Sequence, residues 1–164
     1  MPSQDLAPVS SLVAPKPSRP GILAALRDFF NLTPDKPPEL IVDLSDRQVY
    51  LAQNETVIAN YQVAIGQAGW ETPVGQFSVI NMQQDPVWQH PFTGEIVAPG
   101  ATNPLGSRWI GFWTDGAHQI GLHGTNQEDL IGQAVSHGCI RLREADIQAL
   151  FTQVTIGTPI TVRP

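Results

Sequence analysis

HQIGLHGTNQEDLIGQAVSHGCIRL, residues 118–142, contains the single cysteine of the chain and three of its four histidines. Because Cys139 has no second cysteine to pair with, an intramolecular disulfide is impossible and its thiol is free. A free thiol has a pKa of about 8.5 and becomes a good nucleophile at neutral pH when a nearby imidazole accepts its proton. Histidines precede Cys139 by two residues, at His137, and by sixteen, at His123. The stretch therefore indicates a thiol nucleophile with its base.

Gly138 directly precedes the cysteine. A glycine keeps the backbone bare and permits unusual φ and ψ angles, as an oxyanion site made of backbone N–H groups requires. Taken alone, a cysteine is most often a small buried apolar residue and a histidine a hydrogen-bonded polar one. The combination of thiol, imidazole and glycine favours the nucleophile over these structural alternatives.

The same residues resemble a known family. His123-Gly124-Thr125 and Ser136-His137-Gly138-Cys139-Ile140-Arg141 look like the signature of the L,D-transpeptidase catalytic domain, also called the YkuD domain. Residues 71–77 (ETPVGQF) and 103–112 (NPLGSRWIGF) are similar to two further motifs of that family. The resemblance extends over residues 39–164. It implies a mostly β fold, a sandwich or meander of the L,D-transpeptidase catalytic type with one or two short helices.

The resemblance implies a role for each motif residue. Cys139 matches the nucleophile, His123 the general base, and the carbonyl of Gly124 the group that holds the other nitrogen of the imidazole. His137 is a competing base, because in an extended segment its side chain and that of Cys139 point to the same side. The N–H groups of Gly138 and Cys139 are candidates for the oxyanion hole.

The substrate would be a peptidoglycan stem peptide. The resemblance implies attack on the carbonyl of the third stem residue, release of the terminal D-alanine, and a thioester on the enzyme. Arg141, Ser136 and Trp109 are the candidate substrate-binding residues; the planar fork of an arginine suits a carboxylate. No cofactor or metal is expected. The resemblance implies a role in cell wall biogenesis and cell shape, and a location in the cell envelope or periplasm.

Composition narrows the classes of partner. The formal net charge is −6, and no cluster of Lys and Arg is available to bind phosphates, which argues against nucleic acid as a partner. Fifteen prolines and fourteen glycines favour a loop-rich β protein. No run approaches the roughly 18–20 apolar residues of a membrane-spanning helix. No secretory signal peptide is readable, and no pattern indicates an oligomeric state.

Two regions are predicted. Residues 1–38 read as a proline-rich leader with a short amphipathic helix over 22–30, and residues 39–164 as the catalytic domain. Alternating apolar positions predict strands. These cover residues 40–44, 49–51, 57–65, 77–79, 108–114, 118–123 and 160–162.

Three further segments of the chain lead to separate predictions. Residues 82–107 lack periodicity, which favours a lid or substrate-lining loop over a surface excursion packed by its apolar side chains. Thr125 and Glu128 fit a capping box at the start of a short helix. Residues 144–153 are predicted to form an amphipathic helix, for which Arg143 is a poor N-cap.

Other functions fit the same residues. An L,D-carboxypeptidase would form the same acyl-enzyme and transfer it to water. His118, His123, His137 and Cys139 are chemically suitable zinc ligands, although the first two face opposite sides of one predicted strand. A catalytically silent wall-binding module is the third alternative.

Overall fold

The computed structural model of the chain describes residues 35–90 and 92–164. The predicted leader and its helix therefore lie outside the described residues, apart from the segment 35–38. The first strand begins at Glu39, where the catalytic domain is predicted to start. The boundary between two regions stays a prediction.

Five strands form the larger sheet. They are ordered β3-β2-β1-β13-β5, with bounds β1 (Glu39–Asp43), β2 (Gln48–Gln53), β3 (Thr56–Gln62), β5 (Gly75–Ser78) and β13 (Pro159–Arg163). The pair β1 and β13 is parallel, and the other pairs are antiparallel. Leu40 and Val42 on β1 are fully buried. The two-residue period predicted for residues 40–44 is thus confirmed, whereas the strand predicted over 57–65 ends at Gln62 and its Val57 is 53% exposed.

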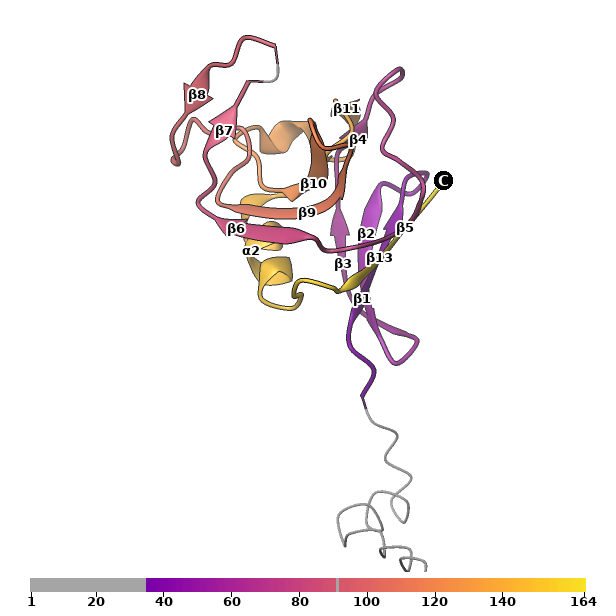
Figure 1. The fold of residues 1–164 in the computed structure, drawn as a ribbon. Coiled ribbons are helices and arrows are strands. Elements are labelled where there is room, and N and C mark those ends of the chain that lie inside the picture. Colours follow the sequence, from indigo (N-terminus) through magenta and orange to yellow (C-terminus); the bar gives the residue numbers. More distant parts are fainter. Residues whose placement is uncertain (1–34, 91) are drawn as a thin grey trace, which may run out of the picture. The chain divides into compact units, whose positions relative to one another are not determined.

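The second sheet carries His123 and Arg141 of the histidine–cysteine motif. Its order is β12-β10-β9-β6, with bounds β6 (Asn81–Gln84), β9 (Arg108–Thr114), β10 (Gln119–His123) and β12 (Ile140–Arg141). Two short ladders flank it: β4 (Ile65–Gly66) with β11 (Ala134–Ser136), and β7 (Trp88–Gln89) with β8 (Ile96–Val97). Figure 1 shows the β7–β8 hairpin projecting away from the two main sheets.

A single hydrophobic core joins the sheets to the helix α2 (Glu144–Phe151). It contains Leu51 of the first sheet, Ile110 and Leu122 of the second, and Ile147 and Leu150 of α2. Figure 1 shows α2 beside the second sheet. Over the described residues the fold is mostly β with one α-helix, which confirms the predicted class. Among the described residues, no helix combines the length and apolar character needed to cross a membrane.

The predicted capping box is wrong. Thr125 Oγ1 accepts the N–H of Gln127 at 3.0 Å, but the Glu128 carboxylate accepts the N–H of Glu144 at 2.9 Å. Glu128 therefore caps α2, whose own N-cap residue provides no side-chain bond. The helix predicted after Thr125 is only the 3-10 turn η1 (Glu128–Leu130). The first backbone N–H of α2 has no partner within its own helix. It bonds to the Glu128 carboxylate, which is therefore not used in a local capping box.

The segment 82–107 is not structureless, because it contains most of β6 and the β7–β8 hairpin. Of the three apolar side chains expected to pack a surface excursion, Phe92 and Ile96 are 69% and 68% exposed, and Trp88 is partly buried. The packing alternative therefore has little support. A lid role for this segment stays a prediction.

Candidate active site

Strand register brings three of the predicted site residues into one row. His123 on β10 is the partner of Trp109 on β9 and of Arg141 on β12. Because directly opposed residues in neighbouring strands project to the same face, the indole, imidazole and guanidinium lie side by side. Each of the three strands contributes one of these side chains, although the three residues are separated in the sequence.

The next row on this face is nearly bare. Asn81 on β6 is the partner of Gly111 on β9, which is the partner of Gly121 on β10. A Cβ at Gly121 would lie 2.6 Å from the carbonyl oxygen of Ile110 and 2.8 Å from the indole of Trp109. A Cβ at Gly111 would overlap Asn81 Oδ1. The glycines let the indole lie across the sheet, which is the close approach expected of glycine in a strand.

His123 is held at one ring nitrogen and by stacking on its ring. Its side chain is buried, and Nδ1 lies 2.5 Å from the carbonyl oxygen of Gly124. Since a carbonyl can only accept, Nδ1 carries the proton and Nε2 is left as the basic nitrogen. The Trp109 ring stacks on the imidazole at 6.0 Å between centroids and 19° between planes. Trp109 Nε1 in turn donates to Asn81 Oδ1 at 2.7 Å.

Burial controls the charge of this imidazole. It lowers the pKa of His123 to about 4; the bond to Gly124 opposes the shift and the positive charge of Arg141 adds to it. The ring is therefore neutral at physiological pH. A neutral imidazole can accept a proton, which a general base must do.

The loop before β12 turns sharply at Gly138, where φ is +107°. The Ser136 hydroxyl donates to the carbonyl of Cys139 and accepts the N–H of Gly138 at 3.2 Å. Ser136 is almost fully buried, and these bonds shape the loop; its role in binding substrate stays a prediction. The Gly138 N–H is already bonded to Ser136 Oγ, and its role in the oxyanion hole also stays a prediction. The Cys139 N–H has no acceptor among the described residues, and it stays the candidate donor.

His137 forms no hydrogen bond with the Cys139 thiol among the described residues. Its ring is exposed and packs edge-on against Trp70, with centroids 4.9 Å apart, and near Phe92 at 6.3 Å. The expectation that His137 and Cys139 share a side assumed an extended segment. The positive φ of Gly138 removes that condition, and His137 lies in an aromatic cluster with Trp70 and Phe92.

The thiol of Cys139 is partly exposed and lies 3.9 Å from the carbonyl oxygen of Gln119. Within the described part of the chain no hydrogen bond joins it to an imidazole. Burial raises the pKa of the Cys139 thiol, opposed by the N–H of Gly121 and by the charge of Arg141. The resting pair is accordingly a neutral thiol and a neutral imidazole.

This resting state predicts the pH dependence of thiol alkylation. Because the pKa of the thiol is raised and that of the imidazole is lowered, a thiolate–imidazolium pair is not formed at acid pH. The rate of iodoacetamide labelling of Cys139, followed by intact mass, should therefore rise about tenfold per pH unit from pH ~6 to pH ~8. A rate that is flat across this range would contradict the neutral pair.

Thr72 anchors the nucleophile loop and was not recognised as a functional residue in the sequence. Its buried hydroxyl donates to the carbonyl of Gly138 at 2.9 Å and accepts the N–H of Gly66 at 3.2 Å. The signal was present in the motif at residues 71–77, but nothing in the sequence indicated that this turn contacts a loop 66 residues away. Asn81 was missed for the same reason.

Replacing Thr72 by valine keeps the side-chain shape and removes both hydrogen bonds. Two buried backbone groups would then lack partners, so the free energy of unfolding should fall by about 1–3 kcal/mol. Urea denaturation measures this change. The matched control is Thr72→Ser, which keeps the hydroxyl and should retain most of the stability; a stable Thr72→Val beside a destabilised Thr72→Ser would show that the methyl group matters instead.

Arg141 is half-buried and forms no salt bridge with any described residue. A guanidinium without a protein anion, beside the thiol and the imidazole, can bind the carboxylate of an incoming ligand.

The proposed zinc ligands do not come together. His118 is exposed and bonds to Asp115 at 3.1 Å, and His137 lies against Trp70. Over residues 35–90 and 92–164, no three potential metal-binding side chains cluster. The zinc alternative is therefore not supported by this geometry.

A family model and a curated relative both relate this chain to one family. Residues 37–162 match the family model of the L,D-transpeptidase catalytic domain, YkuD. YqjB of Bacillus subtilis, named for the same family, is 35% identical over 128 residues, which are 76% of this chain and 70% of that protein.

Two solved structures share the fold. L,D-transpeptidase 3 of Mycobacterium tuberculosis is 15% identical with a TM-score of 0.65, and covers 78% of this chain. The L,D-transpeptidase of Enterococcus faecium is 23% identical with a TM-score of 0.63, and also covers 78%. The match spans 61% and 50% of those two chains, respectively.

Proposed function

The chain belongs to the L,D-transpeptidase catalytic domain (YkuD) family, and on that premise we propose that it catalyses acyl transfer between peptidoglycan stem peptides. One observation carries the proposal. The partly exposed thiol of Cys139 lies beside the backbone of Gln119 and Gly121 on β10, the strand that ends at the buried imidazole of His123, and the charge of Arg141 acts on both groups; the free nitrogen of that imidazole is Nε2. On the same premise we propose that it acts in the cell envelope.

In the first half of the proposed reaction, Cys139 Sγ attacks the carbonyl carbon of the third residue of a tetrapeptide stem. His123 Nε2 takes the thiol proton, and the Cys139 N–H supports the oxyanion. The tetrahedral intermediate then collapses. The C–N bond to the terminal D-alanine breaks, His123 returns the proton to the leaving amine, and a thioester remains on Cys139.

In the second half, the amine of an acceptor stem attacks the thioester carbon. His123 takes a proton from the attacking nitrogen, the C–S bond breaks, and the Cys139 sulfur leaves and regains the proton. Neutral His123 suits this cycle, because it must be a base in each attack and an acid in each departure. Arg141 is the proposed partner of a stem-peptide carboxylate.

The test uses purified full-length chain and a disaccharide tetrapeptide, with products identified by mass spectrometry. Cross-linked dimers and free D-alanine support the proposal. Tripeptide monomers without dimers would instead identify an L,D-carboxypeptidase. Folded protein that gives no product and no carbapenem adduct, yet binds cell wall sacculi, would identify a silent wall-binding module.

A further inference from the structure

One peptide group connects the imidazole to the start of α2. The carbonyl of Gly124 accepts from His123 Nδ1, and the N–H of the same peptide, on Thr125, donates to Glu144 Oε1 at 3.0 Å. A trans peptide is planar, and its C=O and N–H point in opposite directions. Fixing the N–H therefore fixes the direction of the carbonyl that holds the imidazole.

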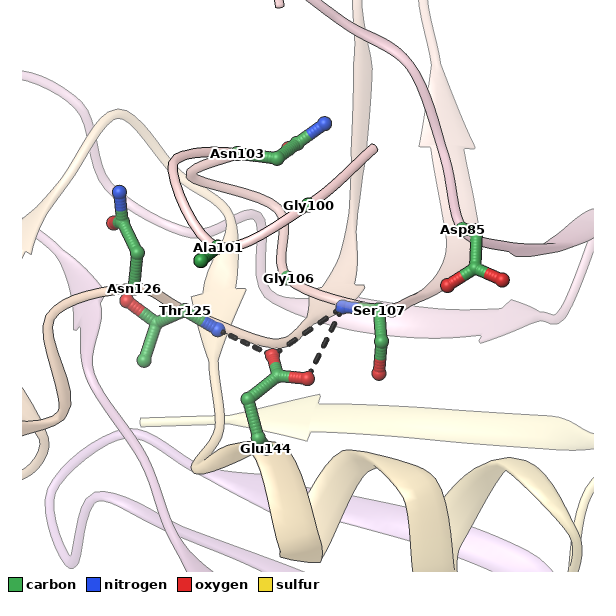
Figure 2. A pocket seen from close by; sticks show the side chains of 9 residues that line it. All are labelled: Asp85, Gly100, Ala101, Asn103, Gly106, Ser107, Thr125, Asn126 and Glu144. Atoms are coloured by element: carbon green, nitrogen blue, oxygen red, sulfur yellow. Dashed lines mark hydrogen bonds between the residues drawn. The ribbon is translucent and has the colours of Figure 1, made fainter. Parts of the chain in front are cut away.

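The Glu144 carboxylate is itself firmly placed. Figure 2 shows it facing the backbone of Ser107 and Thr125, and Oε2 accepts the Ser107 N–H at 3.1 Å. It is packed against Gly106 and Gly124, where a Cβ on either glycine would overlap it. Its helix is anchored in the core, because the side chains of Ile147 and Leu150 are fully buried.

The charge of Glu144 is directed at this backbone. Among the described residues Glu144 forms no salt bridge. It lines a hollow of about 230 Å³ together with a second acidic residue, Asp85. Asp85 has its own cation, Arg108, at 3.8 Å. An anion that accepts a peptide N–H polarises that peptide and strengthens the hydrogen bond accepted by its carbonyl. The effect grows when the imidazole becomes positively charged.

We infer that Glu144 is a positioning residue, which orients and polarises the Gly124 carbonyl and through it holds His123 ready to accept the thiol proton. This inference rests on the proposed function for its catalytic consequence. The arrangement places a peptide group between imidazole and carboxylate, where a nucleophile–base–acid triad has a direct bond.

A purely structural role for Glu144 would be to tie the loop at Ser107 to α2. The two roles differ in what they change. Loss of a structural tie lowers stability and leaves the imidazole as it was. Loss of a positioning residue changes the ring nitrogens of His123 and the rate of the chemical step.

The experiment compares Glu144→Gln with Asp146→Asn. Both remove one negative charge from the first turn of α2, but only Glu144 bonds to the peptide of Thr125. We expect Glu144→Gln to lower kcat for D-alanine release about ten- to a hundredfold, with KM within about twofold. We also expect it to shift the ¹⁵N signals of the His123 ring. Asp146→Asn should leave both readouts near wild type.

Unchanged kcat and unchanged ring signals in Glu144→Gln, beside an active wild type, would overturn the inference. An inactive wild type would instead overturn the proposed function, and the ¹⁵N signals would still test the orientation of His123. If Glu144→Gln does not fold, Glu144→Asp replaces it. That variant keeps the charge on a shorter side chain, and the absence of any change in it would equally overturn the inference.

Discussion

Replacement of Cys139 by alanine is expected to abolish D-alanine release, with a fall in rate of at least about 10⁴-fold. The reason is that no other cysteine exists in the chain, so no thioester can form. Removing the nucleophile of a covalent mechanism typically costs this much or more, because the remaining groups cannot replace the bond. Release of D-alanine from a tetrapeptide donor, measured by mass spectrometry, gives the rate.

A second readout locates the covalent step. A carbapenem should add its mass to the wild-type chain and should not add to Cys139→Ala. The control for folding is the urea midpoint of the variant, which should stay near wild type because the thiol is partly exposed and its hydrogen bond to the Gln119 carbonyl is weak. Full D-alanine release by the alanine variant would end the covalent account.

The sequence predicted the positions of the strands better than the pairing between them. Alternating apolar residues located β1 and β2, since each buries one face. The parallel pairing of β1 with β13 joins residues about 120 positions apart. Such a pairing depends on the packing of the whole core, and no local pattern encodes it. The same limit explains why Glu128 caps α2 rather than its own turn.

The candidate site shows a similar division. Cys139, His123 and Gly124 were identified because they lie within one short motif. Thr72, Asn81 and Glu144 act from elsewhere in the chain, through backbone groups that any residue carries. A side chain that bonds to a backbone carbonyl or N–H has no recognisable partner in the sequence. Only the folded arrangement reveals its role.

His123→Ala is expected to lower the rate of D-alanine release about 10²–10⁴-fold, the usual contribution of a general base. The matched control is His137→Ala, for which we expect a loss below about tenfold, because that ring packs on Trp70 and not on the thiol. Alanine at position 123 leaves a ring-sized space beside Trp109. Added imidazole can enter it, and should restore part of the His123→Ala rate and none of the His137→Ala loss. Normal turnover in His123→Ala together with a lost rate in His137→Ala would reverse the assignment of the base.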